Sequence, residues 1–153
     1  PLFGEDGEDD SDDRSGTIYV LRSHSDDPRV SAHRELIHKI GVTGGLVETR
    51  IAQAATDATY LLAEVEIVAT YKLFNINRTK LEALIHRFFT PARLDLTIQD
   101  RFGNPVQPRE WYLVPLHVIA ETVERIRDGS IQGFRYDPAT ASLVEITAAD
   151  SPG

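Results

Sequence analysis

Gly16-Thr17-Ile18-Tyr19-Val20-Leu21 is a run of β-branched and aromatic residues, and such a run predicts a β-strand. A second apolar run, residues 36–42, is followed by a threonine and two glycines and predicts another strand. Residues 23–35, which contain two consecutive aspartates and a proline, are expected to form a long exposed loop. Two strands joined in this way predict an antiparallel hairpin.

Helical and strand patterns follow this hairpin. A helix is predicted from Leu46, with one apolar face made by Val47, Ile51 and Ala54. Residues 60–73 alternate between apolar and polar residues and predict a long half-buried strand. Its apolar side is expected to consist of Leu61, Ala63, Val65, Ile67, Ala69, Tyr71 and Leu73. A second helix is predicted to end before Pro91, with the core residues Leu81, Leu84, Ile85 and Phe88.

The remaining chain predicts smaller elements. Residues 91–110 are expected to be mostly loop, with a short strand at 94–98, and residues 111–114 predict a further strand. A helix is expected to begin at Pro115 and to stop at Gly129, and residues 134–136 and 143–146 predict a terminal hairpin. The fold class is therefore α+β, with a small, mostly antiparallel sheet flanked by helices, a C-terminal helix and a short β-hairpin.

The charge of the chain is unevenly distributed. The net charge is −8 over 153 residues, but residues 1–14 hold seven acidic residues and one basic residue, which leaves −2 for the other 139. With only two apolar residues, this stretch cannot bury enough surface to fold and is expected to be a disordered linker. Because the rest is nearly neutral, its charge does not exclude a nucleic-acid partner.

Composition excludes several classes of protein. The absence of cysteine rules out a disulfide framework and thiolate metal sites. No apolar run approaches the roughly 20 residues of a membrane span, and nothing in the sequence resembles a signal peptide, so we expect a cytoplasmic protein without a membrane partner. Since methionine is absent even at position 1, we expect an upstream domain of the same polypeptide. The expected divisions are residues 1–14 as linker, 15–128 as the main domain and 129–153 as a C-terminal extension.

Single residues, rather than one contiguous motif, carry the candidate chemistry. The sequence contains no glycine-rich phosphate loop, no His-x-x-x-His pair and no serine elbow. If the first two strands pair, Tyr19 and Lys39 lie on the same face, and Gly41 is expected to leave space beside Lys39 for a ligand. Arg50, on the next helix, can flank that face.

A carboxylate and an imidazole lie together on the second long helix. Glu82 and His86 are four residues apart, off the apolar stripe, and therefore project side by side. Thr79-Lys80-Leu81-Glu82 also matches a capping box, in which Glu82 would bond to the backbone of Thr79. A helix cap at Asn77 would instead leave Glu82 free.

In their order along the chain, these features resemble the GIY-YIG nuclease superfamily. Gly16-Thr17-Ile18-Tyr19 and Lys39-Ile40-Gly41-Val42-Thr43 resemble its paired motif, in the branch where the second motif reads Lys-Ile-Gly. Arg50 and Glu82 fall where the family places its arginine and its metal-binding glutamate. The chain also resembles that branch in the pattern Glu-x-x-x-His-x-x-Phe, here Glu82, His86 and Phe89, and in the acidic-aromatic pair Glu110-Trp111. The resemblance covers about residues 15–128.

The resemblance implies a divalent-metal-dependent endonuclease that hydrolyses DNA. Glu82 would hold a single Mg²⁺ or Mn²⁺ ion, and Arg50 would clamp nonbridging phosphate oxygens. Tyr19 would act as general base or orient the water, and Lys39, which replaces the family's second tyrosine, would favour the phenolate. His38, Thr43, His86 and Glu110 would be accessory residues.

Other functions are compatible with the same residues. A catalytically inactive nucleic-acid-binding or protein-interaction module on this fold is the main alternative, and a purely structural α+β domain is the third. Read one at a time, the residues favour structural roles: His38 as a hydrogen-bonded core histidine, and Phe89 and Trp111 as core residues.

Overall fold

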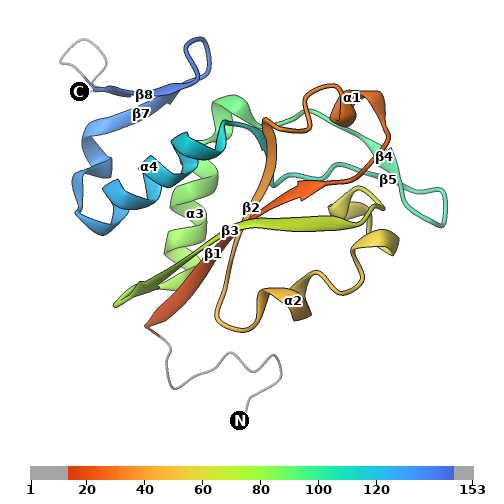
Figure 1. Ribbon diagram of the computed structural model, residues 1–153, viewed down its shortest axis with the longest axis horizontal. Helices are drawn as coiled ribbons and strands as arrows, with labels where there is room; N and C mark the ends of the chain where they lie inside the picture. Colours follow the sequence, from red (N-terminus) through yellow and green to blue (C-terminus); the bar gives the residue numbers. More distant parts are fainter. Residues whose placement is uncertain (1–13, 147–153) are drawn as a thin grey trace.

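A four-stranded antiparallel sheet with the order β3-β1-β2-β6 forms the centre of the molecule. The structure, a computed structural model, describes residues 14–146, so the predicted acidic linker lies outside it except for Arg14. The strands of the sheet are β1 (Ser15–Ser23), β2 (Ile37–Thr43), β3 (Val65–Phe74) and β6 (Trp111–Leu113). Figure 1 shows α3 (Arg78–Phe88) and α4 (Leu116–Arg127) on one side of the sheet and α2 (Val47–Arg50) on the other. The predicted fold class is confirmed.

Strands β1 and β2 form the predicted hairpin, in which Tyr19 is paired with Gly41 and Leu21 with Lys39. The connecting segment is not wholly the exposed loop that its composition predicts. It contains a short helix, α1 (Pro28–Ser31), capped by the side chain of Asp27, and it buries Val30. The same residues that interrupt a strand also start a helix, because aspartate caps the first backbone N–H groups and proline fits the first turn.

The larger core lies between the sheet and the two long helices. Ile18 and Val20 of β1 point to this face, where they meet the buried face of α3 and α4. The α3 residues that are fully buried are Leu81 and Ile85, and Phe89, just beyond the helix end, completes the stripe. Leu84 and Phe88, which the helical spacing also predicts as core residues, are only half-buried.

The opposite face of the sheet carries a smaller core beneath α2. Tyr19 and Leu21 alternate with Ile18 and Val20 along β1 and therefore point to this side. They pack against Val47, Ala54 and Tyr60. A third cluster, next to it, surrounds Trp111 and consists of Val30, Ile37, Leu61 and Leu96.

Strand β3 is shorter than the alternating stretch predicts. Residues 58–60 form a 3-10 helix, η2 (Ala58–Tyr60), which follows η1 (Ala54–Thr56). Leu61 and Leu62 then adopt positive φ angles of 65° and 52°, which no strand accommodates. The strand consequently begins at Val65.

A β-bulge in β3 contradicts the predicted single apolar face. Val20 and Leu21 are neighbours on β1, yet they pair with Ala69 and Ile67, so Val68 is an extra residue. Because one inserted residue reverses the direction of all later side chains, Ala69, Tyr71 and Leu73 face the α3–α4 core, whereas Val65 and Ile67 face α2. The apolar residues of this one regular alternation are therefore divided between the two cores on opposite faces of the sheet.

The C-terminal half largely follows its predicted course. The 91–110 region contains η3 (Thr90–Ala92) and a small sheet of β4 (Ile98–Gln99) and β5 (Pro105–Val106), in place of the predicted strand at 94–98. Pro115 precedes α4, and Gly129, with a φ of 83°, follows its last turn. After η4 (Ser130–Gly133), β7 (Phe134–Asp137) and β8 (Ser142–Glu145) form the predicted hairpin. None of the helices within residues 14–146 has the length and hydropathy to cross a membrane.

Candidate active site

A pocket of about 520 Å³ opens on the α2 side of the sheet. Three of the predicted catalytic residues, Tyr19, Lys39 and Arg50, line it together with Glu110. Its other lining residues are Asp57, Thr59, Tyr60, Gln107, Pro108 and Arg109. Glu82 is not part of this lining, but it lies close to Glu110, as described below.

The Tyr19 ring lies directly over Gly41. A Cβ atom on Gly41 would lie 2.4 Å from both Cζ and Oη of Tyr19. The expectation that Gly41 leaves space for a ligand beside Lys39 is therefore wrong, because the phenol fills that space. The glycine is instead required so that Tyr19, which is 1% exposed, can reach the pocket from the neighbouring strand.

The protonation of Tyr19 also differs from the prediction. Burial raises the pKa of the phenol well above its ordinary value of 10, and Tyr60 and Glu110 raise it further. The cation that lowers this pKa is Arg50, which hydrogen-bonds to the phenol, and not Lys39 as predicted. The ammonium of Lys39 instead forms an ion pair with Glu110. Because its pKa is raised, Tyr19 is a neutral phenol in the protein without bound ligands.

Lys39 is a buried cation with a carboxylate partner. Its side chain is only 5% exposed, and its Nζ donates to Oε1 of Glu110. The Lys39 ammonium also lies 5.1 Å from the centre of the Tyr60 ring, a cation–π distance. Pairing between β2 and β6 ends at Lys39 and Trp111, and the next contact is the backbone N–H of Ile40 donating to the carbonyl of Glu110 at 3.2 Å. The strands thus position both charges.

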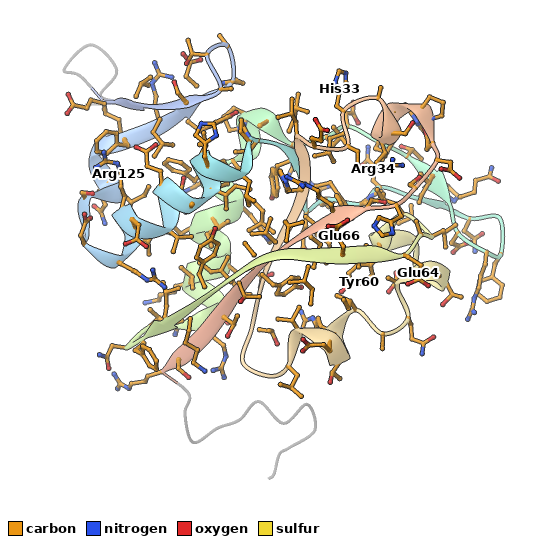
Figure 2. The ribbon with its side chains drawn as sticks, in the orientation of Figure 1. His33, Arg34, Tyr60, Glu64, Glu66 and Arg125 are labelled. Carbon is orange, nitrogen blue, oxygen red and sulfur yellow. The ribbon has the colours of Figure 1, made fainter. Side chains whose placement is uncertain are left out.

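Arg50 and Tyr60 close the α2 side of the pocket. Arg50 is the last residue of α2 and is exposed. The hydroxyl of Tyr60 donates to the Arg50 carbonyl at 3.0 Å, which ties the end of α2 to η2. Figure 2 shows Tyr60 on the α2 side of β3. The indole N–H of Trp111 donates to the Thr59 carbonyl at 3.0 Å, so this core residue also holds the pocket wall.

Glu82 is free of the capping role. The N-cap of α3 is Asn77, whose side chain accepts a hydrogen bond from the backbone N–H of Lys80 at 2.9 Å. Glu82 lies 3.9 Å from Nε2 of His86, and one potential ligand atom from each of Glu82, His86 and Glu110 lies within 4.8 Å of the others. Glu110 consequently belongs both to the pocket and to the cluster on α3.

This cluster fits a small divalent cation. Two carboxylates provide the oxygen ligands that Mg²⁺ and Mn²⁺ prefer. Tyr112 adds a second observation: its side chain is fully buried, and within residues 14–146 its hydroxyl has no hydrogen-bond partner. Burial and the negative charge of Glu110 raise the pKa of Tyr112 to about 12, with a further contribution from Glu82, so the hydroxyl lies close enough to feel both carboxylates. A hydrated cation there would supply its missing partner.

Two predicted accessory residues lie away from the pocket. His38 is fully buried on the α3–α4 side of the sheet, where its Nδ1 donates to the Val114 carbonyl at 2.8 Å and its Nε2 accepts from Arg22 at 3.1 Å. These partners define one neutral tautomer. Thr43 is at the end of β2, and its hydroxyl accepts from the backbone N–H of Gly45 at 3.1 Å.

His38 makes stability sensitive to acid. Burial lowers the pKa of His38 from 6.5 to about 4. Above pH 6.5, His38 is neutral in both the folded and the unfolded protein. Between pH 6.5 and 4, His38 is protonated in the unfolded chain but stays neutral in the folded protein. We therefore expect folding stability to fall by up to about 3 kcal/mol between pH 6.5 and 4 from this residue alone.

Urea unfolding at several pH values tests this. His38→Gln should flatten the decline, whereas the exposed His33, labelled in Figure 2, provides the control His33→Gln with an unchanged profile. Parallel pH profiles for the wild type and His38→Gln would contradict the assignment.

Several pocket residues carry no signal in the sequence. Tyr60 begins the alternating stretch and is predicted to be a strand residue, whereas it lies in η2. Asp57, Thr59 and Arg109 lie outside the long helices and strands, where no periodicity marks them. The pairing of β2 with β6 brings Arg109, within residues 107–110, to the pocket, whereas Thr59 reaches it from η2 and Asp57 from the N-cap of that helix.

Comparisons with known proteins place the chain in a family. It is 42% identical over 117 residues to the uncharacterized protein YeeC of Bacillus subtilis (strain 168), an overlap that covers 76% of this chain and 30% of YeeC. The chain thus spans about a third of the length of that relative. No solved structure matches the chain significantly. The T5orf172 domain matches residues 16–127. This range includes both long helices and the whole central sheet except Ser15, the first residue of β1. The chain therefore belongs to the T5orf172 domain family.

Proposed function

We propose that this domain is a divalent-metal-dependent endonuclease that hydrolyses DNA phosphodiester bonds in the manner of GIY-YIG nucleases. The observation that carries the proposal is the convergence of Tyr19, Lys39 and Arg50 in one pocket, with Glu82 next to the Glu110 that borders it. These residues come from β1, β2, α2 and α3, and only the folded chain brings them together.

Each side chain has a role that its surroundings support. Arg50 is exposed at the pocket rim, where its planar guanidinium can bind two nonbridging phosphate oxygens. Lys39 adds a second positive charge on the pocket floor. Together they would stabilise the charge that develops on the phosphate as water attacks.

Tyr19 acts as a neutral phenol in this proposal. Its raised pKa favours hydrogen bonding to the attacking water, to orient it, over removal of the proton by a phenolate. In the reaction the water oxygen forms a bond to phosphorus and the bond to the leaving sugar oxygen breaks. The attacking water releases one proton to solvent, and the leaving oxygen takes up one proton from solvent, so the step is balanced. Tyr19 would hold the water in line with the leaving oxygen.

Glu82 would hold the metal ion. A bound Mg²⁺ or Mn²⁺ would stabilise negative charge on the leaving oxygen, and Mg²⁺ commonly uses one or two protein carboxylates with water as its remaining ligands. An upstream domain that selects the target stays a prediction.

Cleavage and binding of DNA test the proposal. We expect the protein to cleave plasmid DNA with Mg²⁺ or Mn²⁺ and to stop when EDTA is added. Two cations on phosphate predict that affinity for a short duplex, measured in Ca²⁺, falls about tenfold between roughly 50 and 200 mM salt. Salt-dependent binding without cleavage in any divalent ion would instead favour the inactive nucleic-acid-binding module. A protein that neither binds nor cleaves DNA would contradict both the endonuclease and the inactive nucleic-acid-binding module.

A further inference from the structure

Glu110 lies between two sets of charged groups. On one side its carboxylate accepts from the buried ammonium of Lys39, and on the other it belongs to the cluster with Glu82 and His86. The Glu110 side chain is 34% exposed, against 5% for Lys39, so the carboxylate can move while the ammonium is held. One carboxylate therefore has two possible partners.

The hydrogen bond of His86 occupies one of its two ring nitrogens. Nε2 of His86 lies 3.1 Å from the Ile40 carbonyl, and a carbonyl can only accept, so this nitrogen carries the proton. A protonated ring nitrogen has no lone pair, so Nε2 of His86 cannot bind a metal while it donates to Ile40. Glu82 and Glu110 supply the oxygen ligands of the cluster, and two carboxylates are a number and type of protein ligand that Mg²⁺ commonly uses.

The distances allow both carboxylates to bind one ion. Two oxygens that each lie about 2.1 Å from Mg²⁺ are at most about 4.2 Å apart. The potential ligand atoms of this cluster lie within 4.8 Å of one another, so a small rotation of the Glu110 side chain is enough. The buried hydroxyl of Tyr112, without a partner in the described part of the chain, would then reach a water of the ion.

We propose that Glu110 is the second ligand of the divalent ion, and that binding of the ion withdraws Glu110 from Lys39 and frees its ammonium for phosphate. This inference rests on the proposed function. In the metal-free protein the charge of Lys39 is neutralised by Glu110. Once the ion takes the carboxylate, the described contact left to the ammonium is the Tyr60 ring. The metal and phosphate sites are thereby coupled.

Calorimetric titration of Mn²⁺ into the full chain, without DNA, tests the inference. Glu110→Gln is expected to weaken Mn²⁺ binding at least about tenfold. Lys39→Met is expected to tighten it, because the ion no longer competes with an ammonium. In the double variant this gain should largely vanish, since a cycle isolates the coupling of the two side chains. Glu121→Gln, an exposed helix residue outside the site, is the matched control.

The outcomes separate this inference from the proposed function. Wild-type Mn²⁺ affinity in Glu110→Gln, or an equal gain from Lys39→Met with and without Glu110, would overturn the inference and leave the proposed function standing. Failure of the wild type to bind Mn²⁺, or wild-type affinity in Glu82→Gln, would overturn both.

Tyr112→Phe provides a second measurement that does not alter a charge. Removing a buried hydroxyl that lacks a partner is expected to raise the melting temperature of the metal-free protein. The same variant should show a smaller rise on adding Mn²⁺ than the wild type does, because the hydroxyl no longer contacts the hydrated ion. An equal Mn²⁺-induced rise in both proteins would contradict the placement of the ion beside Tyr112.

Discussion

Replacing Glu82 with glutamine is expected to reduce DNA cleavage about 10³-fold while leaving the fold intact. Glutamine has the shape of glutamate but lacks the negative charge that would hold the metal ion, and the loss of one such electrostatic role costs about 10²–10⁴ in rate. Because Asn77 caps α3, Glu82 has no part in starting the helix. The stability of Glu82→Gln should therefore stay within about 0.5 kcal/mol of the wild type. Single-turnover plasmid cleavage and thermal unfolding measure the two effects.

The control for this experiment is Glu121→Gln, which removes the same charge from the exposed face of α4. It should cleave at the wild-type rate. Cleavage by Glu82→Gln at the wild-type rate, with unchanged dependence on the divalent ion, would rule out the proposed role of Glu82.

Replacing Gly41 with alanine is expected to impair both cleavage and stability. The added methyl group would lie 2.4 Å from Cζ and Oη of Tyr19, so the phenol must leave its position. Tyr19 cannot move freely, because it is packed against Leu21 and Tyr60 in the core beneath α2. Overpacking of this kind costs about 1–3 kcal/mol. In the proposed mechanism a displaced Tyr19 would no longer orient the water, which predicts a loss of at least about 10² in rate.

Gly45→Ala is the matched control for this change. A Cβ at Gly45, just beyond the same strand, would lie 4.0 Å from its nearest neighbour, the Thr43 hydroxyl, so it should be accommodated. Mn²⁺ binding should survive in Gly41→Ala, because the two carboxylates are not displaced by the ring. Urea unfolding, cleavage and calorimetry distinguish these effects. Wild-type cleavage by Gly41→Ala would show that the position of the phenol over Gly41 does not matter.

The period of the apolar residues predicts most of the fold. Alternation in residues 16–21 correctly separates Tyr19 from Ile18, and helical spacing correctly identifies α3 and α4. What the period could not reveal is the bulge at Val68, since an inserted residue changes side-chain direction without changing the sequence pattern. Short 3-10 turns such as η2 are equally hidden, because three residues are too few to show a period.

For the candidate site, the sequence predicts which residues share the pocket better than it predicts their charge states and partners. Tyr19, Lys39 and Arg50 do share a pocket. However, the partner of Lys39 is Glu110, 71 residues away, and no local pattern encodes that contact. The protonation of Tyr19 depends on burial and on Arg50, and both are properties of the folded protein. Residue type is therefore readable from the sequence, whereas charge state follows from tertiary contacts.

The bulge in β3 has a consequence for how molecules of this protein meet in solution. In the described part of the chain β3 pairs with β1 alone, so this ten-residue strand offers its other edge as a template for intermolecular pairing. The extra residue Val68 breaks the regular row of backbone donors and acceptors midway along that edge, and the exposed Glu66 and Lys72 add charge on either side. An incoming strand could match only half of the edge at a time, which protects the protein against aggregation through β3.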